Sequence, residues 1–131
     1  MTITNNTVSQ TDGNGILVTA RDATGRAKIQ NNTVAAPLSG NRNGIRVDAG
    51  NGISVNDSVC LNISGNTTAG VNLSPEGIGL RKQVAGTNNM AFNTFATSPA
   101  TQAQTVAFVG GLNPGSAVNS GTGDRVLDHQ R

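Results

Sequence analysis

Short apolar stretches with alternating polar positions recur along the first two thirds of the chain. One recurring unit, Gly-Ile-x-Val/Leu, is found at Gly15–Val18, Gly44–Val47 and Gly77–Leu80. A second unit, an Ile followed by an Asn-Thr turn, begins at Ile3, Ile29 and Ile63. Successive copies are 29 and 33 residues apart for the first unit, and 26 and 34 residues apart for the second. Because periods of about 20–50 residues are typical of solenoids, whose units bury apolar surface only by stacking, we predict that each period is one coil.

Within each unit the alternation has the period of two that is typical of β-strands. In the first strand the residues predicted to point inward are Ile16, Val18, Ile45, Val47, Ile78 and Leu80. The residues predicted to point outward from the same strands are Thr19, Asp48 and Arg81. In the second strand the inward residues are Ala27, Ile29, Val59, Leu61 and Ile63. Coils that stack like on like would therefore enclose a narrow aliphatic interior.

An asparagine follows each second strand, as in Asn5-Asn6, Asn31-Asn32 and Asn66. Asparagine tolerates the left-handed backbone conformation, and its amide can bond to neighbouring backbone, so these positions predict tight corners. Stacked corner asparagines are predicted to form a hydrogen-bonded ladder.

These units resemble those of right-handed parallel β-helix repeat proteins, the superfamily that includes the pectate lyases. The resemblance covers roughly residues 1–82 and implies an all-β fold, a right-handed parallel β-helix of about three to four coils. The order of Cys60–Thr67, Gly77–Lys82 and Asn93–Phe95 resembles the C-terminal ends of large bacterial surface β-helix proteins. The same repeats build lyases, hydrolases, adhesins, phage fibres and inert surface proteins, so the resemblance leaves the function open.

The last part of the chain has a different pattern, and we assign residues 1–97 to the coils and residues 98–131 to a helix and capping segment of the same domain. Ser98-Pro99 favours the start of a short helix that runs through Val109 and stops before Gly110-Gly111. The side of this helix predicted to face the solenoid consists of Ala103, Val106, Ala107 and Val109. A turn is predicted at Leu112–Gly115, and a last strand near Arg125–Leu127.

The N-terminal end shows no comparable cap, because the chain opens at Ile3 in the middle of a coil. We expect the chain to be part of a longer parent protein. An exposed first coil invites another copy to stack on it, which predicts a homodimer or oligomer through coil-end stacking; the alternative is a frayed N-terminus. The sequence shows no signal peptide and no apolar run long enough to span a membrane.

Composition excludes some functional classes and leaves others open. The chain is 12% charged and 2% aromatic, with a net charge of +2, and its cations are scattered, so binding to nucleic acid is not expected. Cys60 is the only cysteine, which excludes an internal disulfide and a thiolate-rich zinc site. Cys60 is either a small buried apolar residue or, from its alternation with Val59 and Leu61, an outward thiol able to crosslink two chains.

The resemblance implies where a ligand site would lie, because polysaccharide lyases and hydrolases of this superfamily place carboxylates and basic residues on outward positions of adjacent strands. The matching residues are Arg46, Asp48 and Arg81, which we treat as candidate ligand-binding residues for an anionic carbohydrate. Strand spacing of about 4.8 Å brings Asp48 close to Arg81 as an ion pair. The alternative is a solvated surface salt bridge worth less than about 1 kcal/mol.

No other group of residues predicts a catalytic or metal site, and no cofactor is expected. The seven carboxylates include no clear pair for glycoside hydrolysis. Asp12 and Asp57 stand in sequences typical of turns, which explain these residues more simply than calcium binding does. His129 is the third residue from the end of the sequence, where chains usually fray.

The leading hypothesis is therefore a non-catalytic β-helix segment that acts as a structural or adhesive scaffold of a bacterial surface or secreted protein, with an extracellular location. We expect two copies of the segment to associate through its uncapped coil end. The alternative is a polysaccharide-binding or polysaccharide-degrading β-helix module. Enzymatic activity stays open, with the absence of Trp and Tyr favouring the non-catalytic role.

Overall fold

The strands of the chain form three parallel sheets, in a computed structural model that describes residues 1–38, 42–50, 56–68, 77–83, 88–92 and 102–122. Sheet A consists of β1 (Thr2–Thr4), β4 (Thr24–Gln30), β7 (Ser58–Ser64) and β10 (Asn89–Phe92). Sheet B consists of β2 (Thr7–Val8), β5 (Thr33–Val34) and β8 (Thr67–Thr68). Sheet C consists of β3 (Ile16–Ala20), β6 (Ile45–Ala49), β9 (Ile78–Lys82) and β11 (Val118–Thr122).

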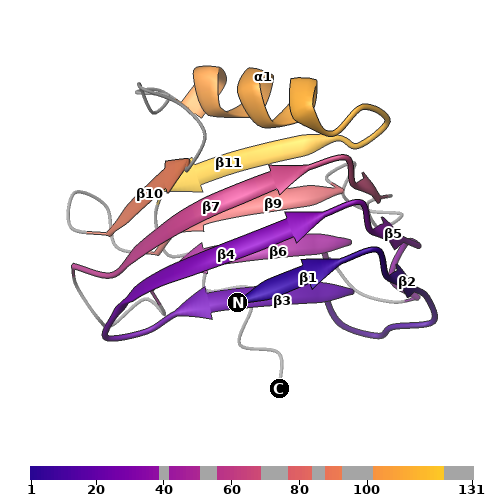
Figure 1. The fold of residues 1–131 in the computed structure, drawn as a ribbon, viewed down its shortest axis with the longest axis horizontal. Helices are drawn as coiled ribbons and strands as arrows, with labels where there is room; N and C mark the ends of the chain where they lie inside the picture. Colours follow the sequence, from indigo (N-terminus) through magenta and orange to yellow (C-terminus); the bar gives the residue numbers. More distant parts are fainter. Residues whose placement is uncertain (39–41, 51–55, 69–76, 84–87, 93–101, 123–131) are drawn as a thin grey trace.

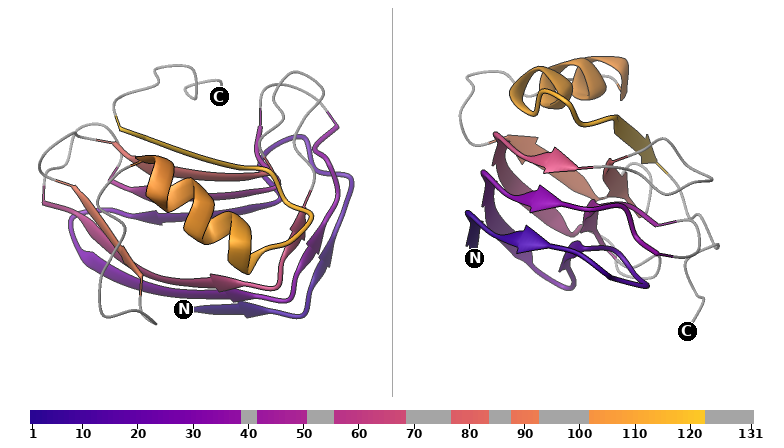
Figure 2. Two further views of the ribbon diagram at one scale, coloured as in Figure 1. Left: turned by 90° about the horizontal axis from the view of Figure 1, so that it is seen from above. Right: turned by 90° about the vertical axis from the view of Figure 1, so that its right-hand side faces the viewer.

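The chain passes through sheets A, B and C in turn and then begins the next coil directly above the last one (Figure 1). Seen along the axis, sheets A and C are the two long opposite sides of each coil, and sheet B closes one short side (Figure 2). All the strand pairings between coils are parallel. The predicted fold class, a parallel β-helix of three to four coils with one C-terminal helix, is confirmed.

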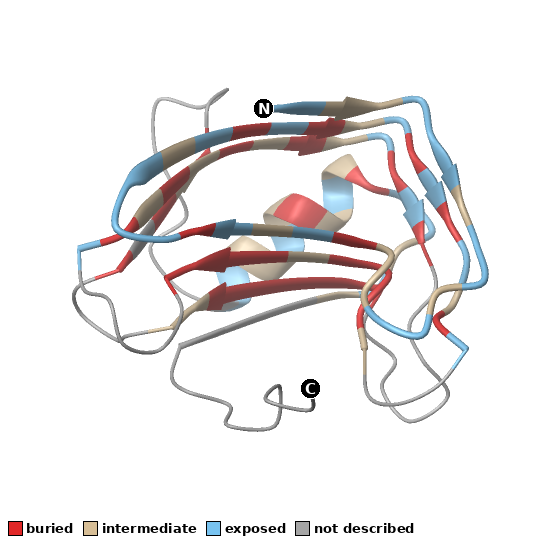
Figure 3. Ribbon diagram, turned by 90° about the horizontal axis from the view of Figure 1, so that it is seen from below, coloured by how far each residue is buried: buried red, intermediate tan, exposed pale blue. Residues whose placement is uncertain are grey.

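The register of the strands stacks like residues on like. In sheet C, Ile16 pairs with Ile45 and Ile45 with Ile78; in sheet A, Ile29 lies between Ile3 and Ile63. The central members of these columns are fully buried, and buried residues recur along the strands of the later coils, whereas β1 and β2 contain none (Figure 3). Each buried Ile contributes about 1.5–3 kcal/mol of hydrophobic free energy, so the repeat sequence that sets the register also supplies the core.

The corner between sheets A and B has the same conformation in each coil. Asn5, Asn31 and Gly65 occupy equivalent positions there with φ values of 58°, 56° and 67°. This left-handed conformation turns the chain sharply from sheet A into sheet B, and Asn and Gly are the residues that adopt it at the lowest cost. The corner predicted from the asparagine pattern is confirmed.

The residue after each corner forms the predicted asparagine ladder. Nδ2 of Asn6 donates to Oδ1 of Asn32 at 3.0 Å, Nδ2 of Asn32 to Oδ1 of Asn66 at 2.9 Å, and Nδ2 of Asn66 to Oδ1 of Asn113 at 2.8 Å. Each acceptor oxygen also receives the backbone N–H of the asparagine that donates to it, at 3.0 Å. Asn32, Asn66 and Asn113 are almost completely buried, so the ladder satisfies polar groups that would otherwise be costly inside the molecule.

Helix α1 (Gln102–Leu112) covers the C-terminal end of the coils, as predicted (Figure 1). It runs through Gly110-Gly111 to Leu112, so the predicted stop before the glycines is wrong. The helix ends instead at Asn113, whose Nδ2 donates to the carbonyl of Val109 at 2.8 Å and whose Oδ1 completes the ladder. Pro114 follows directly; it lacks a backbone N–H and disfavours helical conformation at Asn113, so the helix ends there.

The side of α1 that faces the solenoid differs from the predicted one. Val109 is fully buried, as expected, but Ala103 and Ala107 are exposed. Phe108 packs against the core instead, with its ring 5.4 Å from that of Phe92 in an edge-to-face contact. A large aromatic side chain buries more apolar surface than two alanines, and this difference decides which side turns inward.

The predicted turn after the helix is present, because the N–H of Ser116 donates to the carbonyl of Asn113 and Gly115 has a φ of 86°. The chain then returns to sheet C as β11 and pairs with β9. The predicted strand near Arg125–Leu127 lies outside the described residues. β11 adds a fourth strand to sheet C from within the segment predicted to be a cap.

The first coil of the described residues consists of β1, β2 and β3. β1, β2 and β3 are the outermost strands of their sheets, with a paired neighbour on one side. Ile3, Val8 and Val18 point into the interior of this first coil but are only half-buried, whereas their counterparts in the next coil are 0–2% exposed: Ile29, Val34 and Val47.

Candidate functional site

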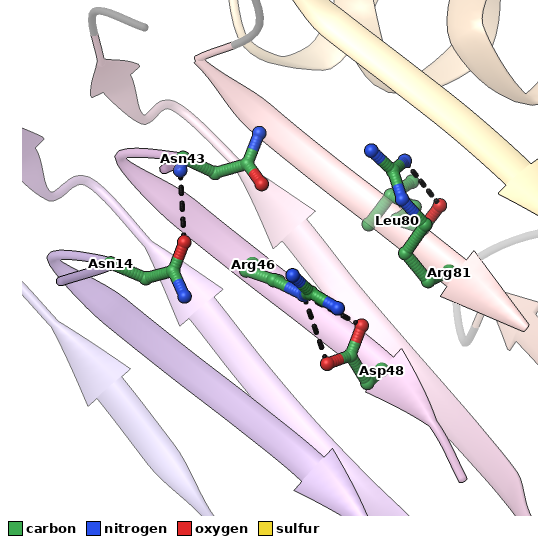
Figure 4. Close-up of polar contacts among 6 residues, drawn as sticks. All are labelled: Asn14, Asn43, Arg46, Asp48, Leu80 and Arg81. Carbon is green, nitrogen blue, oxygen red and sulfur yellow. Dashed lines mark hydrogen bonds and ion pairs between the residues drawn. The ribbon is translucent and has the colours of Figure 1, made fainter. Parts of the chain in front are cut away.

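The candidate residues lie on the outer face of sheet C, as the alternation predicts. Asp48 of β6 pairs in register with Thr19 of β3 and with Arg81 of β9. Arg46 precedes Asp48 by two positions in β6 and so projects from the same face (Figure 4). The structure therefore brings Arg46, Asp48 and Arg81 together on two neighbouring strands.

The ion pair of Asp48 is formed with Arg46 rather than with the predicted partner, Arg81. Nε of Arg46 lies 2.9 Å from each carboxylate oxygen of Asp48 (Figure 4). Arg46 reaches Asp48 along its own strand, where both side chains stand on one face two residues apart. Arg81 turns away and donates from Nη1 to the carbonyl of Leu80 at 3.2 Å.

This pair is not the solvated surface salt bridge that the sequence offered as an alternative. The side chains of Arg46 and Asp48 are 12% and 9% exposed, and Arg81 is buried as well. Burial raises the pKa of Asp48 above its ordinary value of 3.8, against the opposing effects of Arg46, of a hydrogen bond with Gln83 and of the positive charge of Arg81. The cost of removing the Asp48 carboxylate from water exceeds these attractions, so its charged form is buried at an energetic cost.

A second polar column stands beside this pair at the start of the same strands. The N–H of Asn43 donates to Oδ1 of Asn14 at 2.8 Å (Figure 4). Asn43 is 6% exposed, and its amide lies against Gly79, where a Cβ atom would come within 2.6 Å of Oδ1. Glycine at position 79 thus leaves room for a structural asparagine, and the polar groups of this face bond mainly to one another.

The corner between sheets C and A contains another carboxylate in a structural role. Asp57 is 1% exposed; its Oδ1 accepts the N–H of Ala23 at 3.1 Å, and its own N–H donates to Oδ1 of Asn88 at 3.0 Å. Nδ2 of Asn88 donates to the carbonyl of Ala49 at 3.0 Å. Asp57 therefore links three successive coils, which agrees with the turn chemistry expected of it.

The outer face of sheet A presents a different set of groups, which were not among the residues predicted from the sequence. Arg26 and Lys28 stand exposed on β4, and Gln30, which follows on the same face, donates from Nε2 to Oδ1 of Asn62 and Oγ of Ser64 at 2.9 Å. The alternation of Arg26 and Lys28 with the buried Ala27 and Ile29 was the signal that would have found this face.

Cys60 projects from the same outer face of β7 and is half-buried, between the buried Val59 and Leu61. Of the two alternatives for this residue, the alternation supports the outward thiol. His129, Glu76, Asp124 and Asp128 lie outside the described residues. Among the described residues, His, Cys, Asp and Glu side chains form no group of three or more suited to a metal ion.

Comparison with known proteins adds no relative to this picture: no family model, no curated protein and no solved structure matches the chain. Within the described part of the chain, no helix has the length and apolar character needed to cross a membrane. The class of protein is therefore defined by the fold, and it is that of the parallel β-helix proteins.

Proposed function

We propose that the chain is a non-catalytic β-helix segment that serves as a structural or adhesive scaffold of a bacterial surface or secreted protein and self-associates through the coil formed by β1, β2 and β3. The observation that carries this proposal is the asparagine ladder, which runs through all the coils and ends at Asn113 below the capping helix. A continuous buried ladder fixes the spacing of the coils and makes a rigid rod of the kind that presents a surface.

The polar groups on the outside of sheet C support the same proposal. Asp48 is neutralised by Arg46 in a nearly buried pair, and Asn43 is bonded to Asn14. A catalytic carboxylate would need a free face toward its substrate, whereas these side chains use their hydrogen-bonding groups inside the molecule. The resemblance to the ends of bacterial surface β-helix proteins supports the extracellular location.

A specific observation also favours a second candidate, the binding of an anionic polysaccharide by the outer face of sheet A. Arg26 and Lys28 are exposed there, and the remaining outward positions of β1, β4 and β7 carry Thr, Ser, Gln, Asn and Cys without a carboxylate. A face with two cations and two amide side chains complements a chain of uronate or sulfate groups.

A glycan array separates the two candidates and tests the residues predicted from the sequence. The purified chain, an Asp48→Ala/Arg81→Ala variant and an Arg26→Ala/Lys28→Ala variant would be applied to uronate and sulfated glycans, with new reducing ends measured in parallel. The scaffold predicts neither binding nor turnover by any of the three. Binding lost only in Arg26→Ala/Lys28→Ala would establish the sheet A face, and binding lost only in Asp48→Ala/Arg81→Ala would restore the site predicted from the sequence.

A further inference from the structure

We infer that Asn31 is an attachment site for an N-linked sugar, and that the fold favours it over other asparagines with the same sequence signal. The signal is Asn-x-Ser/Thr, the acceptor sequence for N-glycosylation. Within the described residues it begins at Asn5, Asn31, Asn56, Asn62 and Asn66. A repeat rich in Asn and Thr produces this signal by composition alone, so the surroundings of each asparagine have to separate the copies.

Asn31 stands at the corner between β4 and β5, in the second coil. β4 pairs with β1 on one side and with β7 on the other, so Asn31 has a coil on each side along the solenoid axis. Its side chain is nevertheless exposed and makes no hydrogen bond with the described residues. Its backbone N–H donates to the carbonyl of Ser64 at 3.1 Å, so this corner is held without the Asn31 side chain.

The next two residues of this copy have separate roles. Asn32 points inward and carries the ladder, so the middle residue of the signal supplies the buried hydrogen bonds. Thr33 is exposed on β5, and its hydroxyl makes no hydrogen bond with the described residues. A transferase recognises the asparagine and the hydroxyl of the third residue. Both of these groups face solvent in the copy that begins at Asn31.

The third coil leaves space beside Asn31. Gly65 occupies the equivalent corner position, with a φ of 67°, and a Cβ atom there would overlap Oδ1 of Asn31. The corner residue of the third coil therefore adds no side chain over Asn31. An N-linked sugar is bulky and belongs on a surface, and this corner provides the room that it needs.

Asn66 is the contrasting case, one coil above. It is fully buried, and its Nδ2 donates to Oδ1 of Asn113 at 2.8 Å and to the carbonyl of Ile29 at 2.9 Å. A sugar on this nitrogen would break the ladder and force a polar group into the interior. The folded chain should therefore exclude Asn66, although its signal also ends in threonine.

The copies at Asn62 and Asn56 are also less suited than Asn31. Asn62 is half-buried, and its Oδ1 accepts a hydrogen bond from Gln30 at 2.9 Å. Asn56 is exposed, but the hydroxyl of Ser58, the third residue of its signal, already donates to Oγ1 of Thr24 at 3.0 Å. Asn31 thus combines an exposed amide with an exposed hydroxyl in a coil that has neighbours on both sides.

The modification transfers a hexose from a nucleotide diphosphate sugar, under catalysis by a separate transferase. Nδ2 of Asn31 forms a bond to the anomeric carbon C1 of the sugar, while the bond from C1 to the diphosphate oxygen breaks. The diphosphate leaves with the bonding electron pair, and Nδ2 gives up one proton. The product carries its sugar outside the corner, so the core and the ladder stay as they are.

The folded chain, incubated with an N-glycosyltransferase specific for this signal and with uridine-diphosphate glucose, tests the assignment. Peptide mapping by mass spectrometry should find a hexose on Asn31 and none on Asn62 or Asn66. Synthetic peptides with the Asn31 and Asn66 sequences should both accept the sugar, because only the fold separates them. Thr33→Ala removes an exposed hydroxyl and should abolish the gain at Asn31, with circular dichroism to verify that the variant is folded.

A folded chain without sugar on Asn31 would overturn the assignment. Sugar on Asn66 of the folded chain at the rate seen for Asn31 would overturn the role of the fold in the choice. Sugar on Asn31 in Thr33→Ala would show attachment outside the signal and would also overturn it. The modified chain should melt at the temperature of the unmodified chain, and a lower melting temperature would contradict a sugar that lies clear of the core. The inference does not depend on the proposed scaffold role.

Discussion

Replacing one asparagine of the ladder by alanine should destabilise the fold by an amount that depends on its depth in the stack. Asn66 is fully buried; its Nδ2 donates to Asn113 and to the carbonyl of Ile29, and its Oδ1 accepts both donors of Asn32. Asn66→Ala removes all of these bonds and takes away the acceptor of the buried N–H of Asn32. Net contributions of about 0.5–1.5 kcal/mol per bond, and about 1–3 kcal/mol for an unsatisfied buried group, predict a loss of about 2–4 kcal/mol.

The matched control is Asn6→Ala, which removes the same residue type from the equivalent position of the first coil. Asn6 is exposed, and its side chain donates to Asn32 and to the carbonyl of Thr4. Water can replace these bonds, so a loss of about 0.5–1 kcal/mol is expected. Urea unfolding monitored by circular dichroism would give both free energies of unfolding.

A loss for Asn66→Ala equal to that for Asn6→Ala would refute the reasoning, because burial would then add nothing to the value of the ladder. The expected loss is a large part of the total stability, since domains of this size unfold at a cost of about 5–15 kcal/mol. The melting temperature of Asn66→Ala should therefore fall by about 8–15 °C.

Three further predictions concern the cap, the buried ion pair and the corner. Val109→Ala should lower the free energy of unfolding by about 1–3 kcal/mol in a urea titration, because it leaves a cavity under the capping helix; no change would mean that the helix does not seal the core. Burial raises the pKa of Asp48, so the carboxyl of the folded chain stays protonated to a higher pH than that of the unfolded chain. The contribution of Asp48 to stability therefore falls as pH rises above about 3.8, until the pKa of the folded state is passed. Thermal unfolding of Asp48→Asn between about pH 3 and 8 should lack this decrease, and equal pH profiles for the two proteins would contradict it. Gly65→Ala should destabilise by about 1–2 kcal/mol in the same urea assay, because the residue has a positive φ and a Cβ atom would overlap the Asn31 side chain; an unchanged midpoint would show that the corner relaxes freely.

The coils were predictable because each one repeats the same short local signal. The Ile and Val positions of one coil have counterparts in the next, and a one-residue slip would turn Ile45 and Val47 to the outside, so the sequence pattern leaves one register. The left-handed corners followed from Asn5 and Asn31, because few other residues adopt that conformation at low cost.

The features that the sequence did not predict depend on contacts between segments without a repeat. Asn113 completes the ladder from outside the repeated units, so the predicted turn at Leu112–Gly115 gave no sign that its asparagine belongs to the ladder. Asp48 pairs with Arg46 rather than with Arg81 because the Arg46 side chain reaches it along the same strand. The spacing between strands alone does not predict which arginine forms the ion pair. The burial of this pair on an outward face depends on what packs over the sheet, and alternation gives no information about that.

The path of the chain through the coils also determines how the molecule responds to mechanical load. Consecutive coils are joined by single connections, from β3 to β4 and from β6 to β7, so tension applied at the two ends of the chain separates the outermost coil before the next one is loaded. Each coil contains about 30 residues, and its extension adds about 100 Å to the length of the chain. The molecule would therefore lengthen in discrete steps of one coil and absorb work at each step.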